Sequence, residues 1–191
     1  MGAAPQLLAM SASAATLRRG VAIGLAAAVV ALSAQVVVPV PFSPVPMTLQ
    51  PLAVLVVGAL LGPAAGCAAL VAYLMAGVAG IPVFAGGGAG VARLIGPTGG
   101  YLLAFPVAAA VTGWISGAAR RDPRLLRLLL ACAAGIMVIH AGGVAYLALL
   151  GGDTETATRI GLLPFVTGDL LKIGLAAGVV LLAGRRVRSF L

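Results

Sequence analysis

The sequence predicts an all-α integral membrane protein with six transmembrane helices. Hydrophobic residues make up 62% of its 191 residues and charged residues only 8%, and the mean hydropathy is +1.18. Soluble domains average about 45–50% apolar and ~25% charged residues. The length fits a single membrane domain, expected at residues 17–191, with no room for a separate soluble catalytic unit. Residues 1–16, rich in Ala and Ser, are expected to form a flexible N-terminal tail.

Four apolar segments are expected to be membrane helices: residues 17–38, 101–119, 126–150 and 160–185. The stretch 49–80 is too long to form a single membrane helix. As a single helix it would measure ~48 Å, whereas the hydrocarbon core is ~30 Å thick. Gly62-Pro63 offers a break near its middle, because proline lacks an N–H and disrupts a helix interior. The sequence thus predicts two helices here, at 49–62 and 63–80.

The distribution of arginine supports six spans rather than five. Nine arginines flank the apolar segments: Arg18, Arg19, Arg120, Arg121, Arg124, Arg127, Arg185, Arg186 and Arg188. With five spans the cluster at 120–127 would face away from the cytoplasm, whereas with six spans all nine lie inside, as the positive-inside rule requires. The prediction is therefore a multi-pass protein of the inner (cytoplasmic) membrane with both termini cytoplasmic. The pI near 11.1 reflects these flanking arginines, so no nucleic-acid partner is expected.

Two of the loops on the outer side are long and rich in Pro and Gly, at 39–48 and 81–100. The alternating prolines of the first favour an extended, polyproline-like segment. Irregular backbone at membrane depth is tolerated only where it is buried in protein or lines a cavity. The two loops are expected to cover a pocket; the alternative is that they are flexible external connections.

Asp169 and Lys172 lie three residues apart in the last apolar segment, so they share one face of a helix. Each charge near the bilayer centre costs at least ~2.5–3.5 kcal/mol, so the presence of these two residues must have a functional or structural reason. The pair is either a structural ion pair or a binding site for a small polar solute, and the second interpretation is favoured. His140, the one histidine, falls mid-span and is more often an interhelical hydrogen-bond donor than a ligand.

Small residues recur at a spacing of four, a pattern that lets helices approach closely. The glycine examples are Gly20/Gly24, Gly58/Gly62/Gly66, Gly113/Gly117 and Gly174/Gly178. Most are expected to serve packing within the bundle. The first helix carries two alanine examples, Ala22/Ala26 and Ala27/Ala31, and one of its faces is expected to meet another membrane subunit.

Five sequence blocks, in order, resemble the BioY family, the biotin-specific S component of energy-coupling-factor (ECF) vitamin transporters. The blocks are Pro44–Gln50 (PVPMTLQ), Gly58–Gly62 (GALLG), Gly80–Gly87 (GIPVFAGG), Gly96–Tyr101 (GPTGGY) and Gly168–Lys172 (GDLLK). The resemblance covers roughly residues 20–185. It implies a six-helix S-component fold with long first and third outer loops, and capture of biotin beneath these loops for uptake across the cytoplasmic membrane.

The same resemblance implies a transmembrane coupling subunit and two cytoplasmic ATPase subunits as partners, or a homo-oligomer if the chain acts without them. The sequence has no Gly-x4-Gly-Lys-[Ser/Thr] loop, so ATP must be used by another chain. Family members attach to the coupling subunit through small residues of the first helix, and both Ala22/Ala26 and Ala27/Ala31 fit. Biotin is the transported substrate; no cofactor, metal or catalytic residue is expected.

Biotin presents a carboxylate, an apolar chain and ring, and a ureido head, so its site needs a cation, a strong acceptor and apolar walls. Asp169 is the expected acceptor for the ureido N–H groups, and Lys172 serves either the biotin carboxylate or Asp169. Arg93 is the alternative carboxylate partner; otherwise it is solvated or paired with Asp153 or Glu155. Ring contacts and backbone N–H groups are expected from Tyr101, Phe84, Thr98, Gly99 and Gly100.

Three alternatives stay open at this stage. One is an S component for another small vitamin, since the chemistry alone specifies only an amphiphilic anion with a polar head. A second is an intramembrane enzyme that uses Asp169 or His140 as acid and base, although no HExxH, Gly-x-Ser-x-Gly or paired carboxylates occur. A third is a channel or a purely structural protein.

Overall fold

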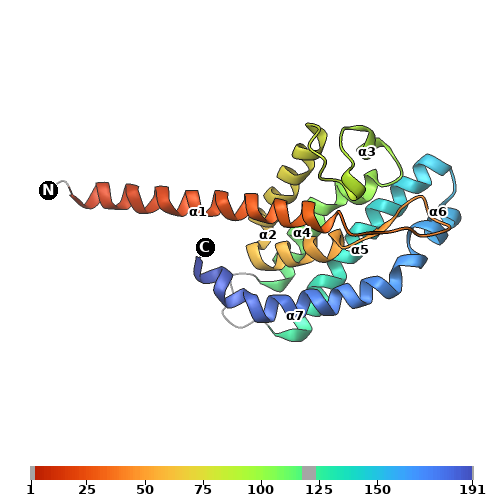
Figure 1. Ribbon diagram of the computed structural model, residues 1–191. Helices are drawn as coiled ribbons and strands as arrows, with labels where there is room; N and C mark the ends of the chain where they lie inside the picture. The colour runs from red at the N-terminus through yellow and green to blue at the C-terminus, as the bar shows by residue number, and fades with distance from the viewer. Residues whose placement is uncertain (1–2, 118–123, 191) are drawn as a thin grey trace.

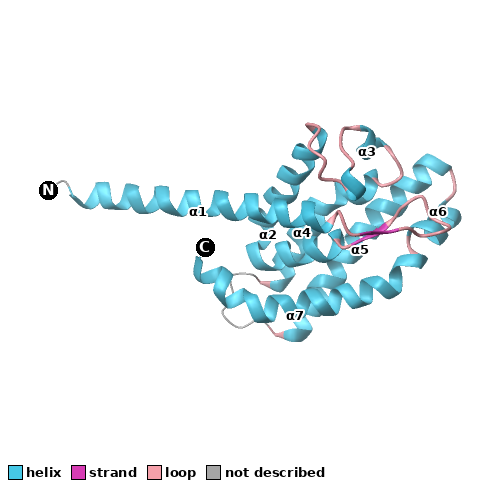
Figure 2. Ribbon diagram, viewed as in Figure 1, coloured by secondary structure: helices cyan, strands magenta, loops and turns pink. Residues whose placement is uncertain are grey.

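The computed structural model describes residues 3–117 and 124–190 and shows a bundle of long helices. Figure 1 traces the chain, and Figure 2 shows one short strand pair among the helices. The elements in order are α1 (Ala3–Ser33), β1 (Val37–Val38), β2 (Met47–Thr48), α2 (Gln50–Val78), the 3-10 turn η1 (Ala85–Gly87), α3 (Ala92–Ile95), α4 (Gly99–Ser116), α5 (Leu125–Gly151), α6 (Thr154–Gly161), the 3-10 turn η2 (Leu163–Phe165) and α7 (Val166–Phe190).

Helix α2 is broken at Gly62, as the sequence predicts. Within the described residues, five helical segments are long and apolar enough to cross a membrane, and Gln50–Val78 is one of them. Gly62 has φ 82° and ψ 178°, a backbone conformation that glycine alone adopts readily, and Pro63 follows it. The two parts of α2, orange and yellow in Figure 1, run in different directions from this break. They provide the second and third of the six predicted membrane segments.

The small residues of α2 and α4 allow these two helices to approach closely, also as predicted. A Cβ atom on Gly113 would lie only 2.7 Å from the carbonyl oxygen of Gly58 and 2.6 Å from the carbonyl carbon of Gly62. Any larger residue would force the helices apart. In contrast, Gly20 and Gly24 of α1 and Gly174 and Gly178 of α7 would meet no heavy atom within 4 Å. Glycines at the same four-residue spacing therefore allow close packing between α2 and α4, whereas in α1 and α7 they lie on the surface.

Helix α1 packs mainly on α2, and its N-terminal part projects beyond the bundle in Figure 1. It begins at Ala3, so residues 3–16, expected to be a tail, form its first turns. It ends at Ser33 rather than at residue 38. The reason is that Val37 pairs with Thr48 and Val38 with Met47 in an antiparallel ladder. The first outer loop is therefore a short hairpin whose base is held by backbone hydrogen bonds.

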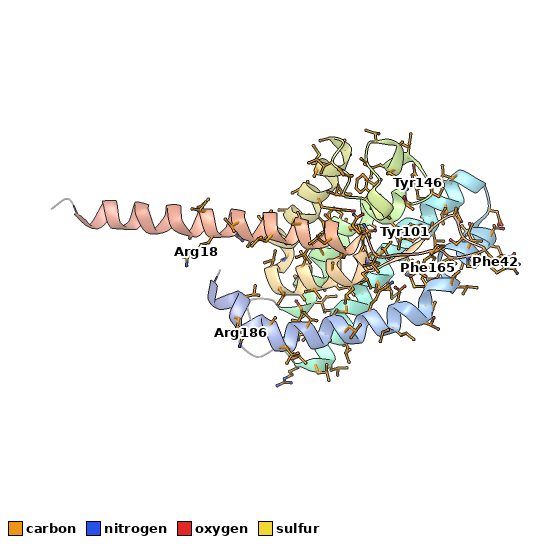
Figure 3. The ribbon with its side chains drawn as sticks, viewed as in Figure 1. Arg18, Phe42, Tyr101, Tyr146, Phe165 and Arg186 are labelled. Carbon is orange, nitrogen blue, oxygen red and sulfur yellow. The ribbon has the colours of Figure 1, made fainter. Side chains whose placement is uncertain are left out.

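The two ends of the bundle differ in composition. Arg18 and Arg186 lie at the end where both chain termini are found, and Phe42 lies at the opposite end, with the hairpin and α6 (Figure 3). This arrangement agrees with an even number of crossings. The segment that follows α5 is mostly the helix α6, because Asp153 caps it by accepting hydrogen bonds from the backbone N–H groups of Glu155 (3.1 Å) and Thr156 (2.8 Å). Hydrogen bonds from Thr156 and Glu155 also lower the pKa of the exposed Asp153 carboxyl.

Candidate ligand-binding site

A cavity lies under the loops at the end of the bundle that carries the hairpin. The space between its walls, counted together with the open mouth, amounts to ≈ 650 Å³. Residues from the hairpin, α2, the loop after α2, α4, α5, η2 and α7 line it. They are Val45, Pro46, Thr48, Gln50, Pro51, Phe84, Ala85, Arg93, Thr98, Tyr101, Leu102, Phe105, Ile136, Ile139, His140, Phe165, Asp169 and Lys172.

Three polar side chains meet at one wall of this cavity, and we refer to them as the polar triad: Asp169, Lys172 and His140. Lys172 Nζ donates to Asp169 Oδ1 at 2.9 Å, and His140 Nε2 lies 2.6 Å from Asp169 Oδ2. Asp169 is in the first turn of α7, where the exposed N–H groups and the helix dipole favour a negative charge. Only 4% of Asp169 and 5% of Lys172 is exposed. The acid and the base predicted from spacing therefore form a buried ion pair that faces a cavity.

The ion pair leaves acceptor capacity on Asp169. An ionised carboxylate offers about four lone-pair directions, and the two contacts from Lys172 and His140 occupy one on each oxygen. A ligand N–H group can therefore still be accepted without breaking the pair. Burial also matters here, because a charge-assisted hydrogen bond formed away from water is about twice as strong as a neutral one. The triad is chemically suited to hold a polar head group.

The walls beside the triad are apolar and aromatic. Tyr101 of α4 and Phe165 of η2 lie beside the His140 ring, with ring centroids 6.1 Å and 6.0 Å from it. Both are labelled near the centre of Figure 3. Tyr101 is fixed because its hydroxyl donates to the carbonyl oxygen of Gly161 at 2.7 Å, which ties α4 to the end of α6. These rigid surfaces can pack on an apolar ring or chain.

The mouth of the cavity is bordered by a different kind of structure, the loop between α2 and α4. Phe84 is 1% exposed and packs edge-on against Tyr73, with ring centroids 5.6 Å apart. Tyr73 accepts a hydrogen bond from Gln50 Nε2 at 2.7 Å and donates to the carbonyl oxygen of Val83 at 3.1 Å. Gln35 Oε1 accepts from the N–H of Gly87 at 3.0 Å. Side chains from α2 and from the link between α1 and β1 thus hold the loop beside the cavity.

Arg93 lies in α3 on this loop and is exposed at the mouth. Neither of the acids suggested as its partner is paired with it, because Asp153 caps α6 and Glu155 lies 3.9 Å from Arg159. Within residues 3–117 and 124–190, Arg93 forms no ion pair within 4.0 Å. Its guanidinium group instead packs over Gly88, where a Cβ atom would lie 2.5 Å from Arg93 Nε. A cation at the mouth is therefore free to meet an anionic ligand group.

Six of the eight residues suggested from sequence line the cavity: Asp169, Lys172, Arg93, Tyr101, Phe84 and Thr98. Gly99 and Gly100 do not. They open α4 and are buried, with Gly99 against the backbone of Leu94 and Gly100 against Gly142 and Tyr146 of α5. Glycine is needed at these positions for close packing. Gly99 and Gly100 stand in the same sequence block as Thr98, so the sequence could not show that only Thr98 of the three lines the cavity.

Sequence reasoning missed the apolar lining from α4, α5 and η2, such as Phe105, Ile139 and Phe165. An apolar residue in an apolar span carries no signal of its own. The prediction that His140 forms an interhelical hydrogen bond is confirmed, because its Nε2 on α5 lies 2.6 Å from Asp169 Oδ2 on α7, but the sequence did not identify Asp169 as the partner. The available signal was that a lone ionisable residue mid-span is expensive and needs a partner.

Comparison with known proteins agrees with this geometry. The model of the BioY family matches residues 8–189, which is nearly the whole chain. The chain belongs to the BioY family. Curated relatives include the probable biotin transporter BioY of Pyrococcus horikoshii, 39% identical over 85% of this chain and 92% of the relative. The biotin transporter BioY of Rhizobium etli is 35% identical over 85% and 88%, respectively. That of Thermotoga maritima is 37% identical over 74% and 82%.

A solved structure resembles the whole bundle. It is the S-component for biotin from an ECF-type ABC transporter, with a TM-score of 0.79 and 25% identity over 91% of this chain and 92% of that one. The predicted family and fold class are thereby confirmed: the chain is an all-α, membrane-spanning BioY protein with the S-component fold. BioY proteins are transport components, so the intramembrane-enzyme alternative is dropped.

Proposed function

We propose that this chain binds biotin in the cavity beneath the hairpin and the α2–α4 loop, and carries it across the membrane as the substrate-specific subunit of an ECF-type transporter. The observation that carries the proposal is the buried Asp169–Lys172 pair facing a cavity in a membrane-spanning bundle. A structural ion pair alone would not need a cavity with an aromatic wall. The membership of the chain in the BioY family supports biotin over other small vitamins.

The arrangement of charges suggests how biotin would lie. Lys172 is already paired with Asp169, whereas Arg93 at the mouth has no acidic partner within 4.0 Å in the described ranges. We propose that the ureido head donates to Asp169, that the ring packs beside Tyr101 and Phe165, and that the carboxylate accepts from Arg93. Arginine suits this role because its planar guanidinium group can bind a carboxylate with two parallel hydrogen bonds.

Transport also requires partners, and we propose a transmembrane coupling subunit with two cytoplasmic ATPase subunits. Helix α1 is the natural contact, because its outer face is largely apolar and open. Leu17, Val21, Leu25, Val29 and Leu32 are 46–71% exposed on it. The alanines suggested earlier lie nearer the bundle: Ala26 is buried, and Ala27 and Ala31 pack against the core. Ala22 is half-buried beside Leu61 and Ala65 of α2. We therefore include the exposed Gly24 and Ala28 in the proposed contact.

The test of the function is direct binding to purified protein. Biotin should bind saturably, whereas thiamin and riboflavin at the same concentrations should not compete with it. Competition by either vitamin at equal concentration would contradict the biotin assignment. Absence of any vitamin binding by folded protein would contradict the function itself.

The proposed orientation in the inner membrane has its own test. With Cys67 and Cys132 replaced, a cysteine at Ala89 in the α2–α4 loop should react with a membrane-impermeant maleimide in intact cells. A cysteine at the exposed Arg124 should react only after the cells are opened. External labelling at position 124 would contradict the six-span orientation.

A further inference from the structure

His140 lies at the boundary between the ligand cavity and a second, lipid-facing groove. The groove runs between α5 and α7, encloses ≈ 790 Å³ including its open side, and is almost entirely apolar. Met137 and Leu170 on its rim are 72% and 66% exposed. Three residues line both spaces: Ile136, His140 and Asp169. The contact between His140 and Asp169 is thus part of the wall between the ligand cavity and the membrane side of the bundle.

The hydrogen bond to Asp169 identifies the donor in this contact. An ionised Asp169 can only accept, so the proton in the 2.6 Å contact belongs to His140 Nε2. His140 Nδ1 is buried and has no hydrogen-bond partner among the described residues. Within the described part of the chain, Asp169 is therefore the one side chain that fixes the orientation of the ring by a hydrogen bond.

The same contact decides where the Asp169 carboxylate points. Lys172 holds Oδ1 from the same helix, one turn away, while His140 holds Oδ2 from α5. The titratable side chains around the ring are Asp169 and Lys172 of α7 and Tyr101 of α4, and the Tyr101 hydroxyl is committed to Gly161. Without His140, no neighbouring helix in the described part of the chain donates a hydrogen bond to Asp169. The carboxylate would then be free to turn between the two spaces that it lines.

We propose that His140 is the positioning residue of the binding site. Its ring donates Nε2–H to Asp169, keeps the carboxylate directed into the ligand cavity, and closes the cavity against the lipid-facing groove. This inference rests on the proposed function, because it assigns Asp169 the role of ligand acceptor.

Two substitutions separate the donor from the bulk of the ring. His140→Phe keeps a ring of similar size in the wall but removes the donor, and it should weaken biotin binding by about tenfold or more. His140→Gln restores an N–H group near Nε2 and should stay within about threefold of the wild type. Binding by His140→Phe equal to wild type would overturn the proposal. So would a folded His140→Gln protein that binds as weakly as the Phe variant.

A second measurement does not depend on any variant folding. His140 is the single histidine in the chain, so protein labelled with ¹⁵N-histidine, purified on a tag without histidine, gives one imidazole signal set. The spectrum should show a protonated Nε2. A proton on Nδ1 with none on Nε2 would overturn the proposal, because Nε2 could then not donate to Asp169. If wild-type protein showed the protonated Nε2 but bound no biotin, the proposed function would fail instead.

Discussion

The polar triad, which we now call the floor of the cavity, and the mouth of the cavity contain cations of the same charge in very different settings. At the floor, Lys172 is 5% exposed, sits on a long helix and is paired with Asp169. At the mouth, Arg93 is exposed, sits in the four-residue helix α3 of a glycine-rich loop and has no acidic partner within 4.0 Å in the described residues. The floor is fixed before a ligand arrives, whereas the mouth is held by a few side-chain hydrogen bonds. The difference suggests that the floor supplies most of the affinity and the mouth controls orientation and exit.

The largest effect is expected at the floor. Asp169→Asn and Lys172→Ala should each weaken biotin binding by at least about tenfold, since a charge-assisted contact in a shielded pocket contributes about 1.5–3 kcal/mol. Binding and thermal unfolding in detergent should be measured on the same samples.

The double variant, Asp169→Asn with Lys172→Ala, distinguishes ligand binding from a purely structural role. A structural pair that loses one member strands a buried charge and is destabilised, and removal of both members restores stability. If the pair binds ligand, the double variant should fold with near wild-type stability and bind no biotin. Undiminished binding by a well-folded double variant would show that the floor is not the site.

A smaller and more selective effect is expected at the mouth. Arg93→Ala should weaken binding of biotin by about three- to tenfold, because an exposed cation is partly screened by water. The same variant should leave the affinity for biotinamide, which lacks the carboxylate charge, unchanged. Arg159→Ala is the matched control, since Arg159 is exposed and paired with Glu155 outside the cavity. An equal loss of affinity for biotin and for biotinamide would show that the biotin carboxylate does not bind Arg93.

The tether of the mouth can be tested without touching the cavity lining. Tyr73→Phe removes the hydroxyl that links Gln50 to Val83, although Tyr73 itself does not line the cavity. The α2–α4 loop should open more often, so biotin should dissociate about two- to tenfold faster, given that a neutral hydrogen bond contributes about 0.5–1.5 kcal/mol. Thr112→Val is the control, because its buried hydroxyl donates to Ala108 of the same helix. An unchanged dissociation rate would show that the tether does not limit exit.

The smallest effect on binding is expected on α1, far from both regions. Ala28→Leu adds bulk to the exposed face of α1, so it should leave biotin binding intact and reduce uptake by cells that contain the ATPase module. Ala27→Leu is the matched comparison on the face packed against the core, and it should lower stability. Normal uptake by Ala28→Leu would exclude this face as the contact with the coupling subunit.

Several features followed from the sequence alone, each for a local reason. Composition required a membrane medium, the placement of arginine required an even number of spans, and Gly62-Pro63 required a break in α2. The i, i+3 spacing of Asp169 and Lys172 placed both on one helix face, where they pair at 2.9 Å. These properties depend on residues close in sequence, so no knowledge of tertiary contacts was needed.

Other features were decided only by tertiary structure. The spacing of Gly20 and Gly24 matches that of Gly58 and Gly62, yet only the second pair faces a neighbouring helix closely. His140 meets Asp169, 29 positions away, because α5 packs against α7. In the described part of the chain, Arg93 has no acidic partner within 4.0 Å, because Asp153 caps α6 and Glu155 faces Arg159. The sequence determined which side chains can bind or pack, but the choice of partner depends on which helices meet, and that is a property of the whole fold.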